Sequence, residues 1–502
     1  MADAPINRTL YAADCLDVLN NEQQLPDESV DLIYLDPPFN SESNYNLPFK
    51  GREKAAYPVE AFTDTWHWRS GEDNAYLQDL HADPRSRSLA NIIQFARDEE
   101  IAQMSAAGGR RKRPVSLASY LLNMGRRLRA MRRVLKPTGS IYLHCDPTCG
   151  HYLKIVLDMV FGRKNFRNEI VWCYTGPSNT KRWFPRKHDT IFFYTKSGKW
   201  TFNADDVRVP YSESFKLRRK YTEGTTGITA GYSEARTESE VEETYGKGKL
   251  IEDWWTDIPA GGGMSRTERL GYPTQKPLTL LERIIRASSD EGDLVLDPFC
   301  GCGTTVHAAE SLGRRWLGID ISPFSTGLIR ERLLGHFPQL EGQITTHGVP
   351  HTAWDARQLA RRDHFEFEKW VCGAIGAEGM FREPGARGAD GGVDGIFEIY
   401  PVHLGQKAKS EYVIVQVKGG KVTPDAVRAL YASVRHYDVR AGVLVCFEEQ
   451  LRTVENQRNK ETFRDSLGEY PVIQGYSVEA LLANRELNLP RYGRRRGGAR
   501  LV

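Results

Sequence analysis

Several features that would place this chain outside the ordinary globular proteins are missing. No stretch approaches the roughly 18 consecutive apolar residues of a membrane-spanning helix, and residues 1–4 do not begin a signal peptide. The eight cysteines are scattered, and neither Cys145 and Cys149 nor Cys300 and Cys302 have the Cys-x-x-Cys spacing of a zinc site. Free thiols in a reducing cytoplasm explain them better, so we expect a cytoplasmic protein.

A large excess of one charge is also missing. The 502 residues include 68 Lys and Arg against 65 Asp and Glu, and a net charge of +3 does not by itself indicate nucleic acid. Local basic clusters occur at 110–113, 216–220 and 491–496, where they could contact phosphates. Solvated loops explain each cluster equally well. The length allows two or three domains, each with its own core.

Apolar runs alternate with helical patterns, which predicts an α/β fold with a parallel sheet. Two long polar stretches, 41–115 and 197–270, interrupt the alternation, and we expect long loops there. The expected strands are 9–13, 30–35, 140–145, 294–296 and 315–319, with an edge pair at 169–174 and 190–195, and the expected helices are 117–135, 152–161 and 278–288.

A glycine-containing loop follows the expected strand at 294–296. The strand ends at Asp297, and Phe299-Cys300-Gly301-Cys302-Gly303 leads into a helix starting at Thr304. Glycines here permit a tight turn and close approach of the backbone to a ligand. Asp320 ends the next strand about 20 residues later, where a dinucleotide-type fold has its acceptor for ribose hydroxyls. The loop is not Gly-x-Gly-x-x-Gly, which favours a nucleoside without phosphates.

A second motif, Asp36-Pro37-Pro38-Phe39, follows the expected strand at 30–35. Its residue types suit a site that holds an exocyclic amine of a base. An exocyclic base amine is a poor nucleophile because its lone pair is delocalised into the ring. Hydrogen bonds accepted from both N–H groups favour a pyramidal nitrogen, and Asp36 and the Pro37 carbonyl offer two acceptors. Phe39 offers a flat face on which the base can stack. A base can reach such a site only after it has left the duplex.

The segment 297–305 resembles the S-adenosylmethionine loop of DNA amino-methyltransferases, and 272–277 is similar to their segment over the methionine end of the cofactor. Because the amine motif precedes the loop, the resemblance is to the circularly permuted beta class, over roughly residues 6–340. Cys302 replaces the Ser often found in the family's loop. The resemblance implies a Rossmann-like methyltransferase sheet that binds S-adenosylmethionine. The implied cofactor-binding residues are Asp14, at the adenine, with Lys276, Asp297, Phe299, Gly301, Gly303, Thr304 and Asp320, and the implied methyl-transfer residues are Asp36, Pro37, Pro38 and Phe39.

The same resemblance indicates which base is methylated. In this family Asp-Pro-Pro-Phe usually accompanies methylation at N6 of adenine, so we expect adenine, with N4 of cytosine as the alternative. Target recognition requires base contacts outside the shared core. The family's pattern assigns them to 197–270. The partner expected from the resemblance is double-stranded DNA, in the cytoplasm of a prokaryote.

The part of the chain after residue 363 carries a second set of chemical groups. A helical pattern includes Glu366 and Glu368, a glycine-rich turn contains Asp394, and the next apolar strand carries Gln416 and Lys418. A carboxylate and a Gln-x-Lys on adjacent strands would hold a divalent metal and place an ammonium beside an attacking water.

This pattern resembles the Mrr-like branch of the PD-(D/E)xK restriction nucleases. The resemblance implies Mg²⁺ held by Asp394 and Gln416, with Lys418 and the helix acid Glu368 completing the nuclease site. We therefore expect a fused restriction–modification enzyme with a methyltransferase at 1–345, a linker at 346–362, a smaller α/β nuclease domain at 363–485 and a flexible basic tail at 486–502. The alternative is an inactive, DNA-binding C-terminal domain. The recognition sequence, the oligomeric state and the role of the insertion at 41–115 stay open.

Overall fold

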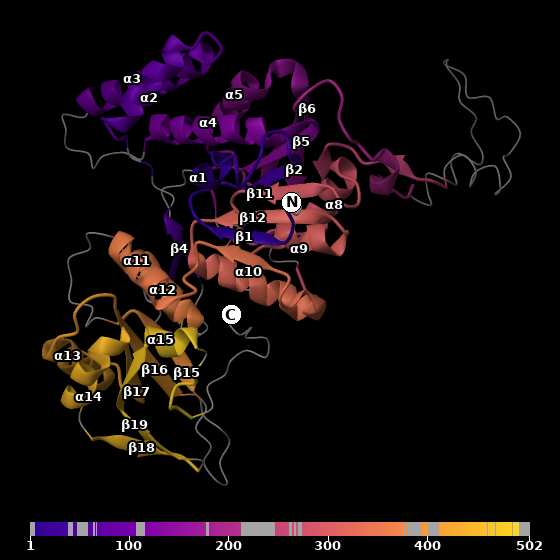
Figure 1. Ribbon diagram of the computed structural model, residues 1–502. Coiled ribbons are helices and arrows are strands. Elements are labelled where there is room, and N and C mark those ends of the chain that lie inside the picture. Colours follow the sequence, from indigo (N-terminus) through magenta and orange to yellow (C-terminus); the bar gives the residue numbers. More distant parts are fainter. Residues whose placement is uncertain are drawn as a thin grey trace, which may run out of the picture.

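The computed structural model divides into a larger N-terminal unit and a smaller C-terminal unit, drawn in indigo to salmon and in orange to yellow, respectively (Figure 1). It describes residues 6–490 except 39–43, 48–58, 64–65, 67, 107–115, 177–179, 212–245, 261–263, 266–267, 270–273, 376–377, 380–392, 400–410, 459, 467 and 484. No helix in these described ranges is long and apolar enough to cross a membrane.

A nine-stranded sheet forms the centre of the N-terminal unit, with the order β10-β6-β7-β5-β2-β11-β12-β1-β13. Its strands are β1 (Thr9–Ala12), β2 (Val30–Leu35), β5 (Leu135–Cys145), β6 (Phe166–Cys173), β7 (His188–Thr195), β10 (Trp254–Trp255), β11 (Leu294–Asp297), β12 (Arg315–Asp320) and β13 (Thr345–His347). Neighbouring strands are parallel except at β7, which is antiparallel to both β5 and β6. The predicted α/β class is confirmed.

Helices cover both faces of this sheet, so its central strands are buried on two sides. Along β2, Ile33 and Leu35 enter the core beneath α1 (Cys15–Leu19), α4 (Leu117–Val134) and α5 (Gly150–Phe161). Leu32 and Tyr34 enter the opposite core, beneath α8 (Leu278–Ser288), α9 (Thr304–Ser311) and α10 (Pro323–His336). This arrangement explains why the strands read as continuous apolar runs.

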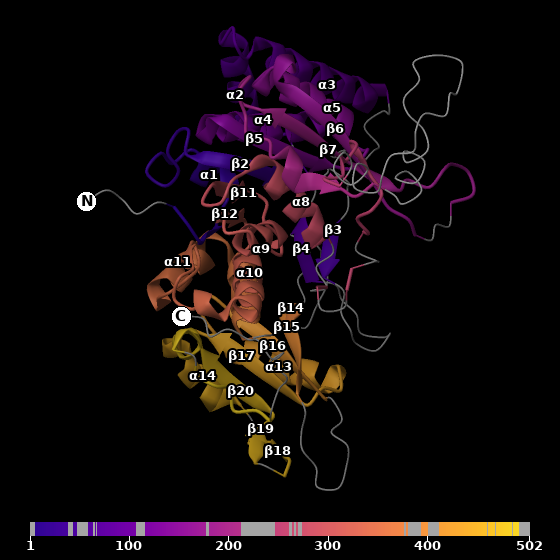
Figure 2. The same cartoon turned by 90° about the vertical axis from the view of Figure 1, so that its right-hand side faces the viewer.

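The polar stretch at 41–115 is more ordered than a long loop. It contains the helices α2 (Glu72–Ala82) and α3 (Arg87–Ala106), which extend the helical layer beyond α4 and α5, at the end of the molecule far from the C-terminal unit (Figures 1 and 2). Buried Leu89, Ala90 and Ile93 attach α3 to the core. The strands β3 (Asn44–Leu47) and β4 (Val59–Thr63) form a hairpin. The expectation of a loop is therefore wrong for 72–106.

Only the ends of the predicted recognition region, 197–270, are well described, because 212–245 lies outside the described residues. The strands β8 (Arg208–Val209) and β9 (Lys249–Leu250) pair where the chain leaves and re-enters this gap. β10 then adds to the edge of the large sheet beside β6. The basic clusters at 110–113, 216–220 and 491–496 also lie outside the described residues.

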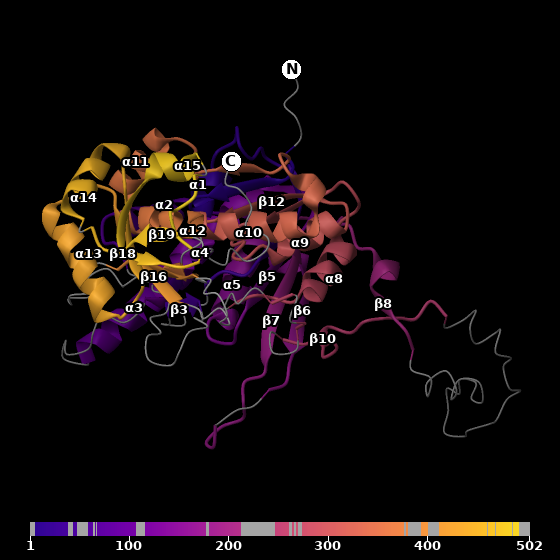
Figure 3. The same ribbon diagram turned by 90° about the horizontal axis from the view of Figure 1, so that it is seen from below.

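The C-terminal unit is built on a five-stranded sheet, β14-β15-β16-β17-β20, and Figure 3 shows this unit beside α10. Its elements are α11 (Ala353–Arg362), α12 (His364–Ala374), β14 (Glu378–Gly379), β15 (Gly395–Ile399), β16 (Glu411–Lys418), α13 (Pro424–His436), β17 (Ala441–Cys446), α14 (Leu451–Gln457), β18 (Thr462–Arg464), β19 (Glu469–Pro471), β20 (Ile473–Ser477) and α15 (Val478–Leu482). β16 is antiparallel to β15 and parallel to β17.

Two boundaries differ from the sequence-based expectation. The expected linker at 346–362 contains α11, whose Ala356 and Leu359 belong to the core of the C-terminal unit. The expected flexible tail begins too early at 486, because Leu487 and Leu489 are buried in the same core. Only two of the apolar residues of α11 are buried, and the helix is short and rich in charge, so the segment was not recognised as part of a core.

Replacing Leu359 with Ala tests whether α11 belongs to the C-terminal unit. Truncating a buried Leu costs about 2–5 kcal/mol, so Leu359→Ala should speed amide hydrogen exchange in α13, β16 and β17 while that of β2 and β11 stays unchanged. Arg361→Ala, at an exposed position on the same helix, serves as the control. Unchanged exchange throughout the C-terminal unit would contradict the assignment.

Candidate active site

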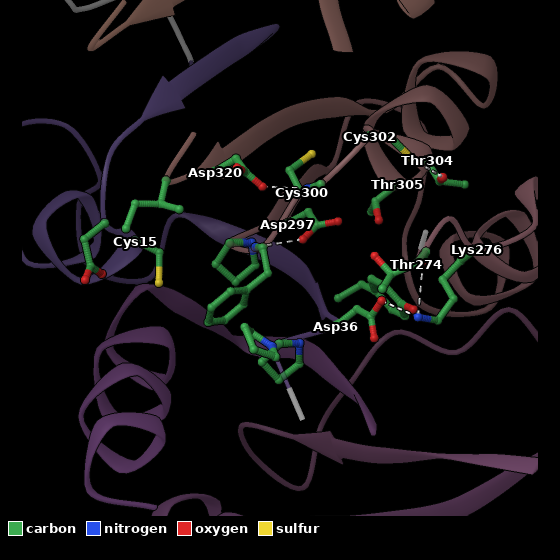
Figure 4. Close-up of a pocket in the computed structure, with 18 of the residues that line it drawn as sticks. Cys15, Asp36, Thr274, Lys276, Asp297, Cys300, Cys302, Thr304, Thr305 and Asp320 are labelled. Carbon is green, nitrogen blue, oxygen red and sulfur yellow. Dashed lines mark hydrogen bonds and ion pairs between the residues drawn. The ribbon is translucent and has the colours of Figure 1, made fainter. Parts of the chain in front are cut away.

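Three neighbouring strands of the large sheet end in carboxylates at one edge. β2, β11 and β12 are adjacent and parallel, so their carboxyl ends lie together. Asp36 follows β2, Asp297 ends β11 and Asp320 ends β12, and all three line one cavity of about 320 Å³ (Figure 4). Parallel α/β sheets generally bind ligands at this edge.

The walls of this cavity combine the two motifs found in the sequence. Of the predicted residues, Asp14, Asp36, Pro37, Pro38, Lys276, Asp297, Phe299, Gly301, Thr304 and Asp320 line it. Gly303 does not line the cavity but is the N-cap of α9. Phe39 lies outside the described residues. The segments 36–38 and 297–302, far apart in sequence, therefore face one space.

Asp36 is paired with Lys276, and this contact was not anticipated. The Lys276 ammonium donates to Asp36 Oδ2, and both side chains are largely buried. The other oxygen, Asp36 Oδ1, is buried and has no hydrogen-bond partner among the residues that the structure describes. Buried acceptors are normally satisfied, so this oxygen is a candidate acceptor for a ligand donor.

The loop between β11 and α9 brings its backbone up to the cavity. Gly301 and Gly303 have φ values of 51° and 78°, a region that residues with a Cβ rarely adopt. A Cβ on Gly303 would come within 2.8 Å of Ile329. The Gly301 N–H donates to Asp320 Oδ2 over 2.8 Å, so the carboxylate at the end of β12 holds the loop in place.

Burial makes the carboxyls beneath this loop difficult to ionise. It raises the pKa of Asp297 to about 7, although Thr305 and the Phe299 N–H donate hydrogen bonds to it, and the nearby Asp36 and Asp320 raise it further. Burial likewise raises the pKa of Asp320 to about 6. A positively charged ligand in the cavity would stabilise the ionised form of these carboxyls.

Asp14 caps helix α1 by accepting from the Leu16 N–H over 2.8 Å. The Arg127 guanidinium also reaches both of its oxygens, over 2.8 and 2.6 Å. Arg127 itself lines the cavity. This pair could not be predicted from the sequence, because Arg127 lies on α4, 113 positions from Asp14, and only the folded chain brings the two together.

A buried chain of hydrogen bonds behind Asp36 was also missed. The Tyr34 hydroxyl and His144 Nδ1 are hydrogen-bonded over 2.8 Å, and burial, with the charges of nearby carboxylates, raises the pKa of Tyr34 well above its usual value. His144 Nε2 then donates to Asp189 over 3.2 Å, and the Tyr174 hydroxyl donates to the same carboxylate over 3.1 Å. The chain fixes the ring that lines the cavity beside Asp36. Period-two alternation in β2, which puts Tyr34 and Asp36 on one face, was the available signal.

A second cluster of predicted residues lies in the C-terminal unit. Gln416 and Lys418 are two residues apart on β16 and therefore share a face. Asp394, just before β15, donates its N–H to the Val415 carbonyl over 2.8 Å and accepts the Val417 N–H at Oδ2 over 2.6 Å. The structure thus places Asp394 directly beside Gln416.

The helix acid Glu368 approaches the same place from α12. Burial raises the pKa of Cys372, and the charges of Asp394 and Glu368 raise it further, so both acids lie near this thiol. Gln416 is 3% exposed, and its Oε1 lacks a partner within the described ranges. An orphan amide oxygen beside a carboxylate suits a hard cation such as Mg²⁺. Within the described ranges, however, no group of three or more His, Cys, Asp or Glu is arranged to hold a metal.

The raised pKa of Asp297 predicts how stability depends on pH. The folded state binds the Asp297 proton more tightly than the unfolded state does. Protonation of Asp297 therefore stabilises the folded state fully below the ordinary pKa of 3.8, and this stabilisation is lost as pH rises to about 7. Asp297→Asn should therefore raise the unfolding free energy of the ligand-free protein by up to about 4 kcal/mol at about pH 8, and by less at about pH 5. Asp79→Asn, at an exposed position, is the control. Equal effects at both pH values in chemical denaturation would contradict the assignment.

Comparison with known proteins gives two family matches and several relatives. A family model described as DNA methylase matches residues 30–330, and one described as restriction endonuclease matches residues 359–461. The Type II methyltransferase M.EcaI of Enterobacter cloacae is 32% identical over 267 residues, which are 44% of this chain and 59% of the relative. M.BamHI of Bacillus amyloliquefaciens is 28% identical over 326 residues, 64% of this chain and 56% of the relative. The chain thus spans under two thirds of the length of these relatives.

Solved structures of DNA methylases also match, at low similarity. A DNA modification methylase from Thermus thermophilus, complexed with S-adenosyl-L-methionine, is 18% identical, with 66% of this chain and 95% of that chain covered and a TM-score of 0.34. The cytosine-N4-specific PvuII DNA methyltransferase is 13% identical, with 68% and 98% covered and a TM-score of 0.36. The family models agree with both predicted resemblances. The chain belongs to the DNA methylase family and carries a restriction endonuclease domain toward its C-terminus.

Proposed function

We propose that the N-terminal unit transfers a methyl group from S-adenosylmethionine to an exocyclic amine of a base flipped out of double-stranded DNA. The observation that carries this proposal is the state of Asp36, whose Oδ2 is held by Lys276 while its buried Oδ1 has no partner in the described part of the chain. An amine N–H is the kind of donor that such an oxygen requires.

The cavity has the features that the cofactor requires. The positive-φ glycines let the backbone approach a nucleoside, Ile321 and Phe299 supply apolar surface, and the carboxylates of Asp297 and Asp320 favour a cationic ligand. When bound, S-adenosylmethionine supplies a methyl group already activated by its positively charged sulfur. We propose that Asp14, Lys276, Asp297, Phe299, Gly301, Gly303, Thr304 and Asp320 hold it.

The protein's part in the reaction is then to orient the amine. Lys276 fixes the Asp36 carboxylate, so Oδ1 and the Pro37 carbonyl can accept the two N–H groups of the target amine and favour a pyramidal nitrogen. Positioning and charge complementarity supply most of the rate enhancement when the reacting group is already activated. Pro38, and the stacking face predicted for Phe39, would confine the base.

We propose adenine N6 as the target amine, because the motif beginning at Asp36 resembles that of adenine-specific enzymes. The segment 197–270 is the proposed recognition region, and β10 anchors its C-terminal part to the sheet that carries the amine site. Base contacts made there would select the sequence in which the flipped adenine lies.

Replacing Asp36 with Ala tests the amine site. Losing the acceptor should reduce methyl transfer to duplex DNA by about 10²–10³-fold or more while the affinity for S-adenosylmethionine stays within a few-fold of wild type. Asp17→Ala, an exposed carboxylate on α1, should leave both quantities unchanged. Methyl transfer that survives Asp36→Ala would overturn the assignment. Incorporation of labelled methyl groups measures methyl transfer, and calorimetry measures the affinity for S-adenosylmethionine.

We also propose that the C-terminal unit cuts DNA with Mg²⁺. Asp394 and Gln416 would hold the ion, which would activate a water, while Lys418 and Glu368 would orient and stabilise the reacting groups. The orphan Oε1 of Gln416, next to the backbone-anchored Asp394, supports this assignment. One polypeptide would then both methylate and cleave DNA.

Lys418 provides the matching test of the nuclease. Lys418→Ala should reduce Mg²⁺-dependent cleavage of DNA by about 10²–10⁴-fold, because the ammonium beside the attacking water is lost, while DNA binding persists. Lys421→Ala, an exposed Lys just beyond the strand, is the control. Substrates with and without methylation are both needed, and cleavage that survives Lys418→Ala would show that the site is wrong.

A further inference from the structure

One wall of the cofactor cavity comes from the C-terminal unit. Helix α12 packs its Phe367 and Trp370 into the core of that unit, yet its Glu366 and Lys369 line the same cavity as Asp320. Figure 1 shows α12 at the side of the C-terminal unit that faces the N-terminal unit, and Figure 3 shows it beside α10, which it contacts. The cavity that holds both methyltransferase motifs is therefore completed by a helix from outside the methyltransferase unit.

The carboxylate of Glu366 is only half satisfied. Its Oε1 accepts the Lys369 ammonium over 2.9 Å, and each side chain is 17% exposed. Its Oε2 is buried and has no hydrogen-bond partner in the part of the chain that the structure describes. The ion pair with Lys369 fixes the carboxylate, and the open oxygen is left for a donor in the cavity.

Asp320, the predicted acceptor for the ribose, differs from Glu366 because both of its oxygens already accept hydrogen bonds. Its Oδ2 accepts the Gly301 N–H over 2.8 Å, and its Oδ1 accepts the Ser322 N–H over 3.0 Å. Both oxygens are thus already engaged in holding the loop. The charge of Glu366 contributes to raising the pKa of Asp320, which agrees with the two carboxylates lying close together. At this end of the cavity, within the described residues, Glu366 Oε2 has no partner, whereas each oxygen of Asp320 has only its remaining lone pair to offer a ligand.

We propose that Glu366 accepts a hydrogen bond from a ribose hydroxyl of bound S-adenosylmethionine, so that the C-terminal unit contributes directly to the cofactor site. This inference rests on the proposed function of the N-terminal unit. It adds a residue of α12 to the proposed cofactor-binding residues, all of which otherwise lie between Asp14 and Asp320. Removal of Glu366 should weaken cofactor binding even though the residue belongs to the other unit.

The test measures binding by calorimetry with the full-length chain and three ligands: S-adenosylhomocysteine, methylthioadenosine and 2′,3′-dideoxy methylthioadenosine. A hydrogen bond to a charged group contributes enough that Glu366→Ala should weaken binding of the two ligands with ribose hydroxyls by about 10–100-fold. The same variant should change the affinity for the dideoxy ligand by less than about threefold. Glu366→Gln, which keeps the side-chain volume, should weaken the two hydroxylated ligands to a smaller extent.

The chain offers a matched control in Asp425, an acid in the first turn of α13 that pairs with Arg428 three residues later, as Glu366 pairs with Lys369. Asp425→Ala should leave all three affinities unchanged. Equal affinities of wild type and both Glu366 variants would overturn the inference and leave the proposed function standing. Equal losses for hydroxylated and dideoxy ligands would also overturn it, since only a structural role for Glu366 would remain. A wild-type protein that does not bind S-adenosylhomocysteine would overturn both.

Discussion

The accumulation of carboxylates at the ends of three adjacent parallel strands is the constraint on which the site depends. Because β2, β11 and β12 run side by side, Asp36, Asp297 and Asp320 meet at one buried edge. Their burial is unfavourable, as the raised pKa values of Asp297 and Asp320 show. Lys276, the Gly301 N–H and the Thr305 hydroxyl offset part of this cost. Among the described residues, Asp36 Oδ1 still has no hydrogen-bond partner, and the acidic cavity suits the cationic cofactor and the amine substrate that we propose.

The positions of the three carboxylates could be predicted from the sequence, because each of the three strands is an apolar run that ends at or just before an Asp. Their common edge followed from the expectation of a parallel sheet. The pairing of Lys276 with Asp36 did not, because it joins segments that only the folded chain brings together. The resemblance assigned Lys276 to the cofactor, and the structure shows that Lys276 holds the carboxylate of Asp36. Arg127 beside Asp14 was missed for the same reason.

Where the prediction of elements failed, the apolar signal was weak. Helix α11 has only Ala356 and Leu359 as buried residues, and α3 combines a buried stripe at Leu89, Ile93 and Ala96 with exposed apolar residues at Phe95 and Ile101, which obscure the pattern. Tertiary packing stabilises them instead. The role inferred for Glu366 was similarly hidden, since the sequence indicates an acid on a nuclease helix and gives no sign that this helix reaches the other unit. The two units are therefore joined by more than a linker, because they share the wall of one cavity.

The central role that we propose for this protein is presentation of an exocyclic amine for methylation at Asp36. Expression of the protein in a host without DNA methylation, followed by sequencing that distinguishes the modified bases, tests this claim directly. We predict N6-methyladenine at one recurring sequence context. DNA that stays unmodified, or that carries methyl groups only on ring carbons, would contradict it.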